Sequence, residues 1–166
     1  MTVTSVERDP VALTLTITSE LAVTVERAWQ LWADPRQLER WWGPPTYPAT
    51  FVDHDLSPGA RVSYFMTGPD GGKSHGYWDV VAADPPRRLE VQDGFADDTG
   101  APSGMPDGPG AMVVTLAETA DGAGTVMVIE SRFPSAASME QLLAMGQEEG
   151  MVAALAQIEG ILADTA

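Results

Sequence analysis

The sequence predicts a single α+β domain, in which seven antiparallel strands are combined with two short helices after the first strand and a long C-terminal helix. Three observations lead to this prediction. Segments with a period of two are separated by turns rich in Gly and Pro. Apolar residues recur with a helical period in two regions, 25–42 and 138–164. The chain has 166 residues, 44% of them apolar, which suits one hydrophobic core.

The N-terminal region predicts an arm followed by a strand. Residues 1–10 have no sustained period and end in Pro10, so we expect a loose N-terminal arm there and the single domain over residues 11–166. From Val11 to Ile17, apolar residues alternate with Ala and Thr, which is typical of a strand with one buried face.

Two short helices are expected next. Thr24 is a suitable N-cap for a helix whose apolar face carries Trp29 and Trp32. Asp34 is placed to cap a second helix, which Pro35 begins and the Gly43-Pro44-Pro45 segment ends. The aromatic residues of this pair predict a hydrophobic wedge.

Six further strands are expected between the helix pair and the C-terminal helix. Gly and Pro occupy the short turns between most of them, which favours antiparallel neighbours. The expected strands are Thr50 to Leu56, Arg61 to Thr67, Ser74 to Val81, Leu89 to Gln92, Met112 to Leu116 and Thr125 to Phe133.

One hairpin allows a prediction of register. A two-residue turn at Asp70-Gly71 would pair Met66 with His75 and Phe65 with Gly76. A glycine opposite an aromatic residue would give the ring a place to lie. The pattern leaves open which face of the sheet lines a cavity.

Two segments near the C-terminus depart from a regular pattern. The segment from Asp93 to Gly110 is rich in Gly, Pro and Asp, and its large apolar residues Phe95 and Met105 make it either a lid or an acidic excursion. In the helical region from Ser138 to Asp164, the apolar stripe changes side between Met145 and Gly150. We therefore expect the helix to bend or restart there, or its glycines to pack closely.

Composition excludes several classes of function. The net charge of −15 opposes binding to nucleic acid, and the absence of cysteine removes disulfides and thiolate chemistry. No apolar run is long enough for a membrane span, and no targeting segment is apparent, so we expect a soluble cytoplasmic protein. The segment GPDGGKS fails as a phosphate loop because it joins two strands, and the segment DHD alternates across a strand. Accordingly we expect no cofactor and no metal.

The main indication of a site is the number of aromatic and methionine residues. Five Trp and eight Met exceed what a small sheet needs for its core, and Met adapts to varied apolar ligands. Three polar residues, His75, Glu90 and Glu148, are candidates to orient a ligand. Glu148 falls on an apolar helix stripe, where it either has a partner, has a raised pKa, or lies at the edge of the stripe and reaches water. The predicted cavity is lined by Trp42, Phe51, Tyr64, Met66, His75, Trp78, Glu90, Phe95, Met112, Glu148 and Met151.

Four segments carry a resemblance to a known family. They are VERAWQLWADPRQLERWWGP (25–44), LSPGARVSYFMTGPDG (56–71), HGYWDVVAADPPRRLEV (75–91) and FPSAASMEQLLAMGQEEGMVAALAQIEGILA (133–163). Together they resemble the START-like (SRPBCC) superfamily, and within it the activator of Hsp90 ATPase homologue 1-like family. The resemblance implies a helix-grip (START/Bet v 1-like) fold, in which a curved sheet wraps a long C-terminal helix and encloses a pocket. The family commonly opens its last helix with Gly-Trp, where this sequence has Gly150-Met151.

The resemblance implies several functions. Relatives include lipid, hormone and natural-product binders, aromatase/cyclase enzymes, a drug-sequestering protein and the chaperone activator itself. We know of no catalytic set shared by the family and assign none. The leading hypothesis is a binding module for a small lipophilic molecule. The alternatives are a chaperone ATPase activator-like interaction module and a cyclase or hydrolase-like enzyme with Glu148 or His75 as general base. A homodimer and a chaperone remain candidate partners.

Overall fold

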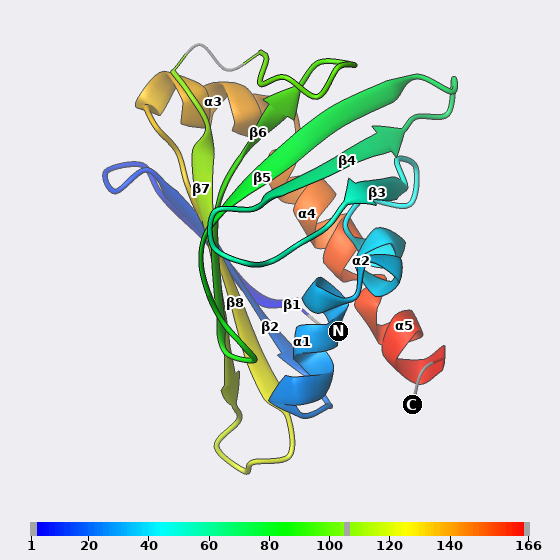
Figure 1. The fold of residues 1–166 in the computed structure, drawn as a ribbon. Helices are drawn as coiled ribbons and strands as arrows, with labels where there is room; N and C mark the ends of the chain where they lie inside the picture. Colours follow the sequence, from blue (N-terminus) through cyan, green and yellow to red (C-terminus); the bar gives the residue numbers. More distant parts are fainter. Residues whose placement is uncertain (1–2, 105–106, 165–166) are drawn as a thin grey trace.

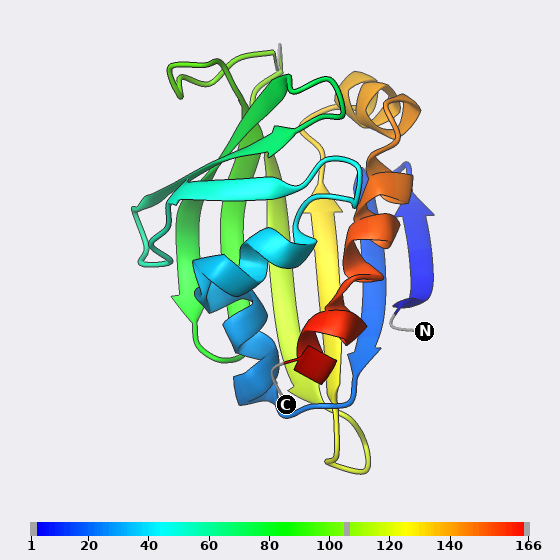
Figure 2. The same ribbon diagram turned by 90° about the vertical axis from the view of Figure 1, so that its right-hand side faces the viewer.

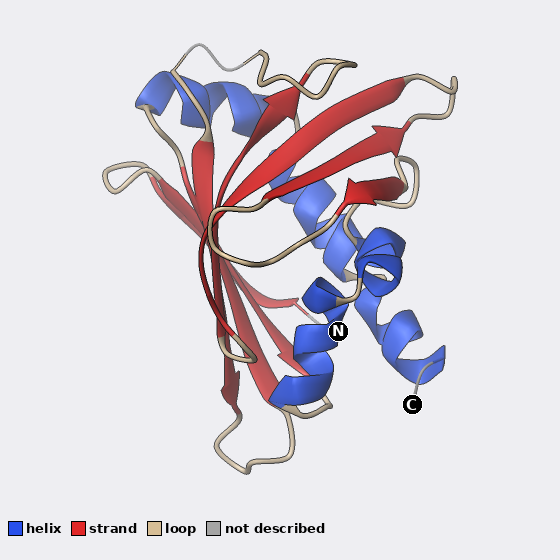
Figure 3. Cartoon of the chain, in the orientation of Figure 1, coloured by secondary structure: helices blue, strands red, loops and turns tan. Residues whose placement is uncertain are grey.

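The computed structural model describes residues 3–104 and 107–164, in which eight antiparallel strands form one curved sheet. The order across the sheet is β1-β2-β8-β7-β6-β5-β4-β3. All the described helices lie on one side of the sheet (Figures 1 and 3), and Figure 2 shows them in front of it. The strands are β1 Val3–Asp9, β2 Thr14–Leu21, β3 Ala49–Asp53, β4 Arg61–Thr67, β5 Lys73–Asp84, β6 Arg88–Ala96, β7 Gly110–Glu118 and β8 Thr125–Arg132.

The first strand corrects the prediction of a loose arm over residues 1–10. Val3–Asp9 pairs antiparallel with β2, with Val6 opposite Ile17, so the described sheet has eight strands where seven were expected. The Asp9 carboxylate accepts hydrogen bonds from the backbone N–H groups of Val11 and Ala12, at 3.0 and 2.9 Å, and so closes the hairpin. Almost every side chain of β1 is exposed, and its sequence therefore shows no alternation of apolar residues.

The helix pair forms as its caps predict. Helix α1 (Val25–Ala33) begins where the Thr24 hydroxyl accepts from the backbone N–H of Arg27, at 3.2 Å. Helix α2 (Pro35–Trp41) begins where the Asp34 carboxylate accepts from the N–H of Arg36, at 2.9 Å. Both N-cap predictions are confirmed, because each side chain pairs a backbone donor that the first turn leaves free.

The register of the β4–β5 hairpin differs from the prediction by one residue. Tyr64 lies opposite Gly76 and Phe65 opposite His75, so the predicted pairing of Met66 with His75 is wrong. The cause is the loop, which spans five residues, 68–72, and is closed by the N–H of Gly68 donating to the carbonyl of Gly72 at 2.8 Å. This shift of one residue in the pairing changes the partner of every side chain. It places His75 on the same face as Phe65, opposite the face of Tyr64 and Met66.

The C-terminal helical region is divided into three helices rather than one. They are α3 (Ala136–Ala144), α4 (Gln147–Leu155) and α5 (Ile158–Asp164). Gly146 has a φ of 89°, which favours glycine, and there the helix restarts as the change of stripe predicted. The second break, at 156–157, was not predicted; the Gln157 amide donates to the carbonyl of Gly43 at 2.7 Å and ties the region to the end of α2.

The hydrophobic core lies between the concave face of the sheet and the helices. Alternate residues of the central strands are fully buried there, among them Ile17, Val91 and Ile129. Helices α1 and α2 cover one end of this face and α4 crosses the other part, as Figure 2 shows. The predicted helix-grip architecture is therefore confirmed, with an additional edge strand and a divided C-terminal helix.

The contact between Gly76 and Tyr64 predicts a sharp effect on stability. A Cβ atom at Gly76 would lie 2.5 Å from Cζ and Oη of Tyr64, whose ring is held by Trp42 and Phe51 at centroid distances of 6.1 and 5.0 Å. We expect Gly76→Ala to lower the free energy of unfolding by about 1–3 kcal/mol in urea titrations. Gly160→Ala, in α5 with open space around it, is the control and should be neutral or stabilising by up to about 1 kcal/mol. Equal effects of the two substitutions would contradict the argument.

Candidate ligand cavity

A cavity of about 410 Å³ lies between the sheet and the C-terminal helices. Strands β4, β6, β7 and β8 supply one wall, and the end of α3, the 145–146 break and the start of α4 supply the other. Its apolar lining includes Trp42, Tyr64, Met66, Phe95, Met112, Phe133, Leu142 and Met151. The wall is mainly aromatic side chains, Met and Leu, with a small number of polar groups, which is the usual make-up of a small-molecule site.

Six of the residues that the sequence placed in a cavity line this one: Trp42, Tyr64, Met66, Phe95, Met112 and Met151. Two others, Phe51 and Trp78, are buried in the adjoining core, with 3% and 0% of their surfaces exposed. Both contact the ring of Tyr64, at centroid distances of 5.0 and 6.1 Å. They support the wall of the cavity without reaching it.

The three polar residues proposed from the sequence do not line the cavity. His75 pairs with Phe65, at a ring distance of 5.7 Å, on the face opposite the one that Tyr64 lines, because of the shifted register. Glu90 accepts from the Arg88 guanidinium at 2.8 Å and alternates with the buried Val91 on its strand. The prediction that His75 and Glu90 line the cavity is therefore wrong.

Glu148 has an ion pair in place of a cavity position. Its carboxylate accepts from Nε of Arg8 at 2.6 Å. Arg8 belongs to β1, the strand that the sequence did not reveal, so the partner of Glu148 could not be named in advance. Of the alternatives that the sequence left open for Glu148, the structure shows the partner.

Asp93 lines the cavity, although it was not among the lining residues predicted from the sequence. It lies opposite Trp78 on β5 and opposite Gly110 on β7, on the concave face. Burial raises the pKa of its carboxyl from 3.8 to about 6. Asp93 was taken as the start of a loop, but its alternation with Val91 and Phe95 along one strand was the signal that places it on the inner face.

Two further buried polar atoms lie at the cavity. The amide oxygen of Gln147 makes no hydrogen bond to the described residues, and the indole N–H of Trp42 has only the hydroxyl of Tyr64 beside it. Burial raises the pKa of the Tyr64 hydroxyl, the Trp42 side chain lowers it, and the nearby charge of Asp93 raises it. Because buried polar groups are almost always paired, these atoms are positioned to pair with a bound molecule or with water.

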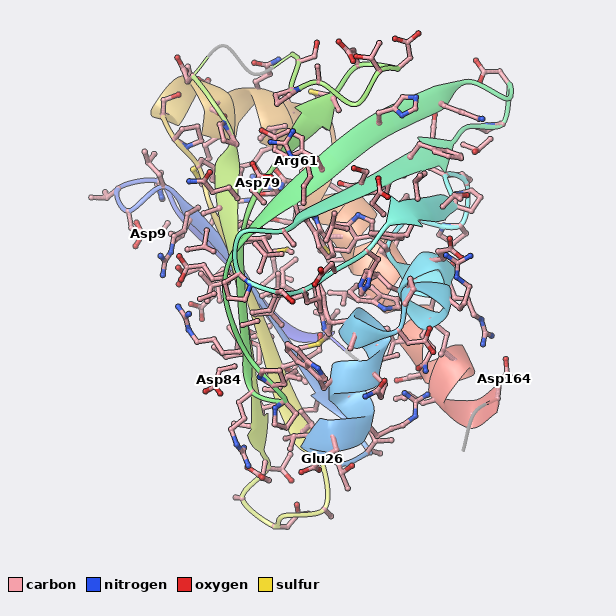
Figure 4. All side chains as sticks on the ribbon, viewed as in Figure 1. Asp9, Glu26, Arg61, Asp79, Asp84 and Asp164 are labelled. Atoms are coloured by element: carbon pink, nitrogen blue, oxygen red, sulfur yellow. The ribbon has the colours of Figure 1, made fainter. Side chains whose placement is uncertain are left out.

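The opposite, convex face is organised by ion pairs. Arg61 donates from Nε and Nη2 to the two carboxylate oxygens of Asp79, at 2.7 and 2.9 Å, and the two residues lie together beside β4 and β5 in Figure 4. The Arg61 guanidinium also lies 4.7 Å from the ring centre of Tyr77. Asp79 on this face therefore has a cation beside it, whereas Asp93 has none among the described residues.

The loop after β6 is held by hydrogen bonds within itself. The Asp97 carboxylate accepts from the N–H groups of Thr99 and Ala101, at 2.9 and 3.1 Å, and Ala96 pairs with Pro102. Met105, which the sequence made a candidate for a lid, lies outside the described residues. Within the described ranges, no helix could span a membrane and no group of three or more acidic or His residues could hold a metal ion.

Residues 22–163 match the family described as "Activator of Hsp90 ATPase homolog 1-like protein". The chain belongs to this family. The family resemblance that the sequence suggested is therefore confirmed. No protein with a curated functional description matches the chain.

Solved structures of similar proteins agree with this membership. The chain is 48% identical to protein Ms6760 from Mycobacterium smegmatis, over 96% of each chain and with a TM-score of 0.87. It is 44% identical to a protein from Arthrobacter aurescens, over 98% of this chain and 93% of that one, with a TM-score of 0.91. The AHSA1 protein from Silicibacter pomeroyi, 18% identical over 92% and 99% of the two chains, shares the fold at a TM-score of 0.72.

The burial of Asp93 predicts a pH-dependent cost to stability. Its pKa is higher in the folded chain than in the unfolded one, so the cost is absent below pH 3.8 and grows as pH rises through about 6. Asp93→Asn removes this cost. We expect the variant to gain up to about 3 kcal/mol over the native protein at pH 7.5, and about half as much at pH 5. Urea unfolding at both pH values measures the difference, and an equal gain at both would contradict the assignment.

Proposed function

We propose that the protein binds a small, mostly apolar molecule in the cavity between the antiparallel sheet and the C-terminal helices. The supporting observation is the cavity itself, whose volume of about 410 Å³ lies in the range of small-molecule sites. Its aromatic and methionine side chains would bury the ligand, and the polar groups of Trp42, Asp93 and Gln147 would orient it.

The nature of the walls supports a binding role. Met66, Met112 and Met151 come from two strands and a helix, and their unbranched side chains can adapt to ligands of different shape. Met151 takes the place where the family commonly has Trp, so this part of the wall is more adaptable than a rigid ring. The two residues considered as general bases, His75 and Glu148, lie outside the cavity, which favours binding over catalysis.

A co-purified ligand is the most direct test. We expect native mass spectrometry of protein isolated from its own host to show a discrete mass in excess of the denatured chain, because a cavity of this kind retains an apolar ligand. The excess mass gives the ligand class. A clean apo mass, together with no thermal shift from a panel of lipophilic metabolites, would refute the proposal and favour a protein-interaction role, to be tested as stimulation of a purified chaperone ATPase.

Filling the cavity gives a second test, on a defined probe. Gly150 lies in α4 on the cavity wall, and a Cβ built there has open space within 4 Å. A leucine at this position would extend into the cavity without backbone strain. We expect Gly150→Leu to weaken binding of 1-pyrenemethanol by about tenfold or more in fluorescence titrations, because the ligand loses that space.

The control is Gly160→Leu, which makes the same substitution in α5 at an exposed site with open space and away from the cavity. It should bind the probe as the native protein does. Both variants should unfold at urea concentrations no lower than the native protein, since leucine favours a helix over glycine. Equal binding by the two folded variants would place the probe outside the cavity.

A further inference from the structure

Resting on the proposed function, we propose that the ligand carries a protonated amine, which Asp93 holds by a charge-assisted hydrogen bond on the wall of the cavity. The cavity thus selects a lipophilic amine over an alcohol or an acid of the same shape.

The carboxylate of Asp93 is open to the cavity on one side. Its neighbour across β7 is Gly110, which has no side chain; a Cβ there would lie 3.5 Å from Oδ1 of Asp93 and 2.9 Å from the carbonyl oxygen of Arg132. A side chain at this position would clash with the β8 backbone and would lie in van der Waals contact with the carboxylate. The glycine therefore leaves room beside the carboxylate for a ligand group.

No protein cation neutralises this carboxylate. Among the described residues that line the cavity, Arg132 is the only basic one, and its guanidinium is paired with Glu130 on the same strand. The carboxylate of Asp93 has a hydrogen bond with its own backbone N–H, but it makes no ion pair and no hydrogen bond with another described side chain. A buried charge without a partner is costly, and a ligand cation is the group that relieves this cost most.

The other walls also favour a cation. The aromatic rings of Trp42, Tyr64 and Phe95 line the same cavity, and the faces of such rings attract an ammonium group. The oxygen of Gln147 is an unpaired acceptor on the lining of the same cavity. The net charge of −15 raises the local concentration of cations and lowers that of anions.

The inference implies a pH dependence with a definite sign. The pKa of Asp93, raised to about 6 by burial, means that its carboxylate is charged at pH 7.5 and becomes protonated below pH 6. Among the titratable groups nearest it, the pKa values of Tyr64, Tyr77 and Arg132 are raised from values of 10 or more, so these groups keep their charge states between pH 5 and 8. On α4, Glu148 is paired with Arg8 and Glu149 is exposed. Affinity for an amine should therefore fall as pH falls below 6.

The test compares probes that share one ring system. We expect 1-pyrenemethylamine to bind at least about tenfold more tightly than 1-pyrenemethanol at pH 7.5, and 1-pyreneacetic acid to bind most weakly. Asp93→Asn should remove the advantage of the amine over the alcohol, because it removes the charge that pairs with the ammonium group. It should also abolish the loss of amine affinity between pH 7.5 and 5, which calorimetry and fluorescence titration can both measure.

Two controls separate the cavity from the acidic surface. Asp84→Asn makes the same charge change at the exposed end of β5, labelled in Figure 4, and should leave the preference for the amine intact. Repeating the titrations in 0.5 M salt screens surface attraction more strongly than a contact inside the cavity (Debye length roughly 4–5 Å).

The outcomes distinguish this inference from the proposed function. Equal binding of amine and alcohol, or an equal effect of Asp93→Asn on both, overturns the amine assignment and leaves the binding function standing. Failure of all three probes to bind to the folded protein, with no co-purified ligand, overturns both.

Discussion

The packing of four tryptophans joins the helix pair to the sheet, and the position of the cavity depends on it. Trp32 meets Trp41 edge-on at 4.8 Å, and Trp42 meets Trp78 of the sheet edge-on at 4.9 Å. The indole N–H of Trp41 donates to the carbonyl of Leu31 at 2.9 Å, which fixes α2 against α1. These contacts close one end of the curved sheet with large buried rings, and the space remains at the other end.

Much of this architecture could be predicted from the sequence because burial on one face leaves a periodic pattern. The helix caps, most strands and the restart of the C-terminal helix near Gly146 followed from such patterns. Strand β1 was not predicted, because an edge strand with exposed side chains has no apolar period. Arg8, the partner of Glu148, belongs to this strand and so was not predicted either. The register of β4 and β5 was predicted wrongly, because the length of a glycine-rich loop cannot be derived from its residues alone.

The candidate site was less predictable than the fold. Its apolar wall was largely foreseen, since Trp and Met were already in excess for a core. Its polar residues were not, because a polar residue on an inner face looks like the beginning of a loop. Asp93 followed a short run of strand residues and preceded a segment rich in Gly and Pro, so the true end of β6 at Ala96 was placed four residues too early. Sequence patterns predict well which apolar residues are buried, but they predict poorly which polar residues lie on an inner face.

Asp93 connects the stability of the fold with its proposed use. The free protein holds a carboxylate in an apolar environment, which costs free energy at neutral pH, although a neutral Asn would fit the same volume. The side-chain-free position at Gly110 and the polar atoms of Trp42 and Gln147 lie around the same cavity. Binding of a cationic ligand would make the contribution of the Asp93 carboxylate to the free energy favourable. Burial disfavours an isolated charge, but it strengthens the attraction between two opposite charges. A site built in this way is least favourable empty and gains most when it is filled, which is the expected property of a cavity selected for binding.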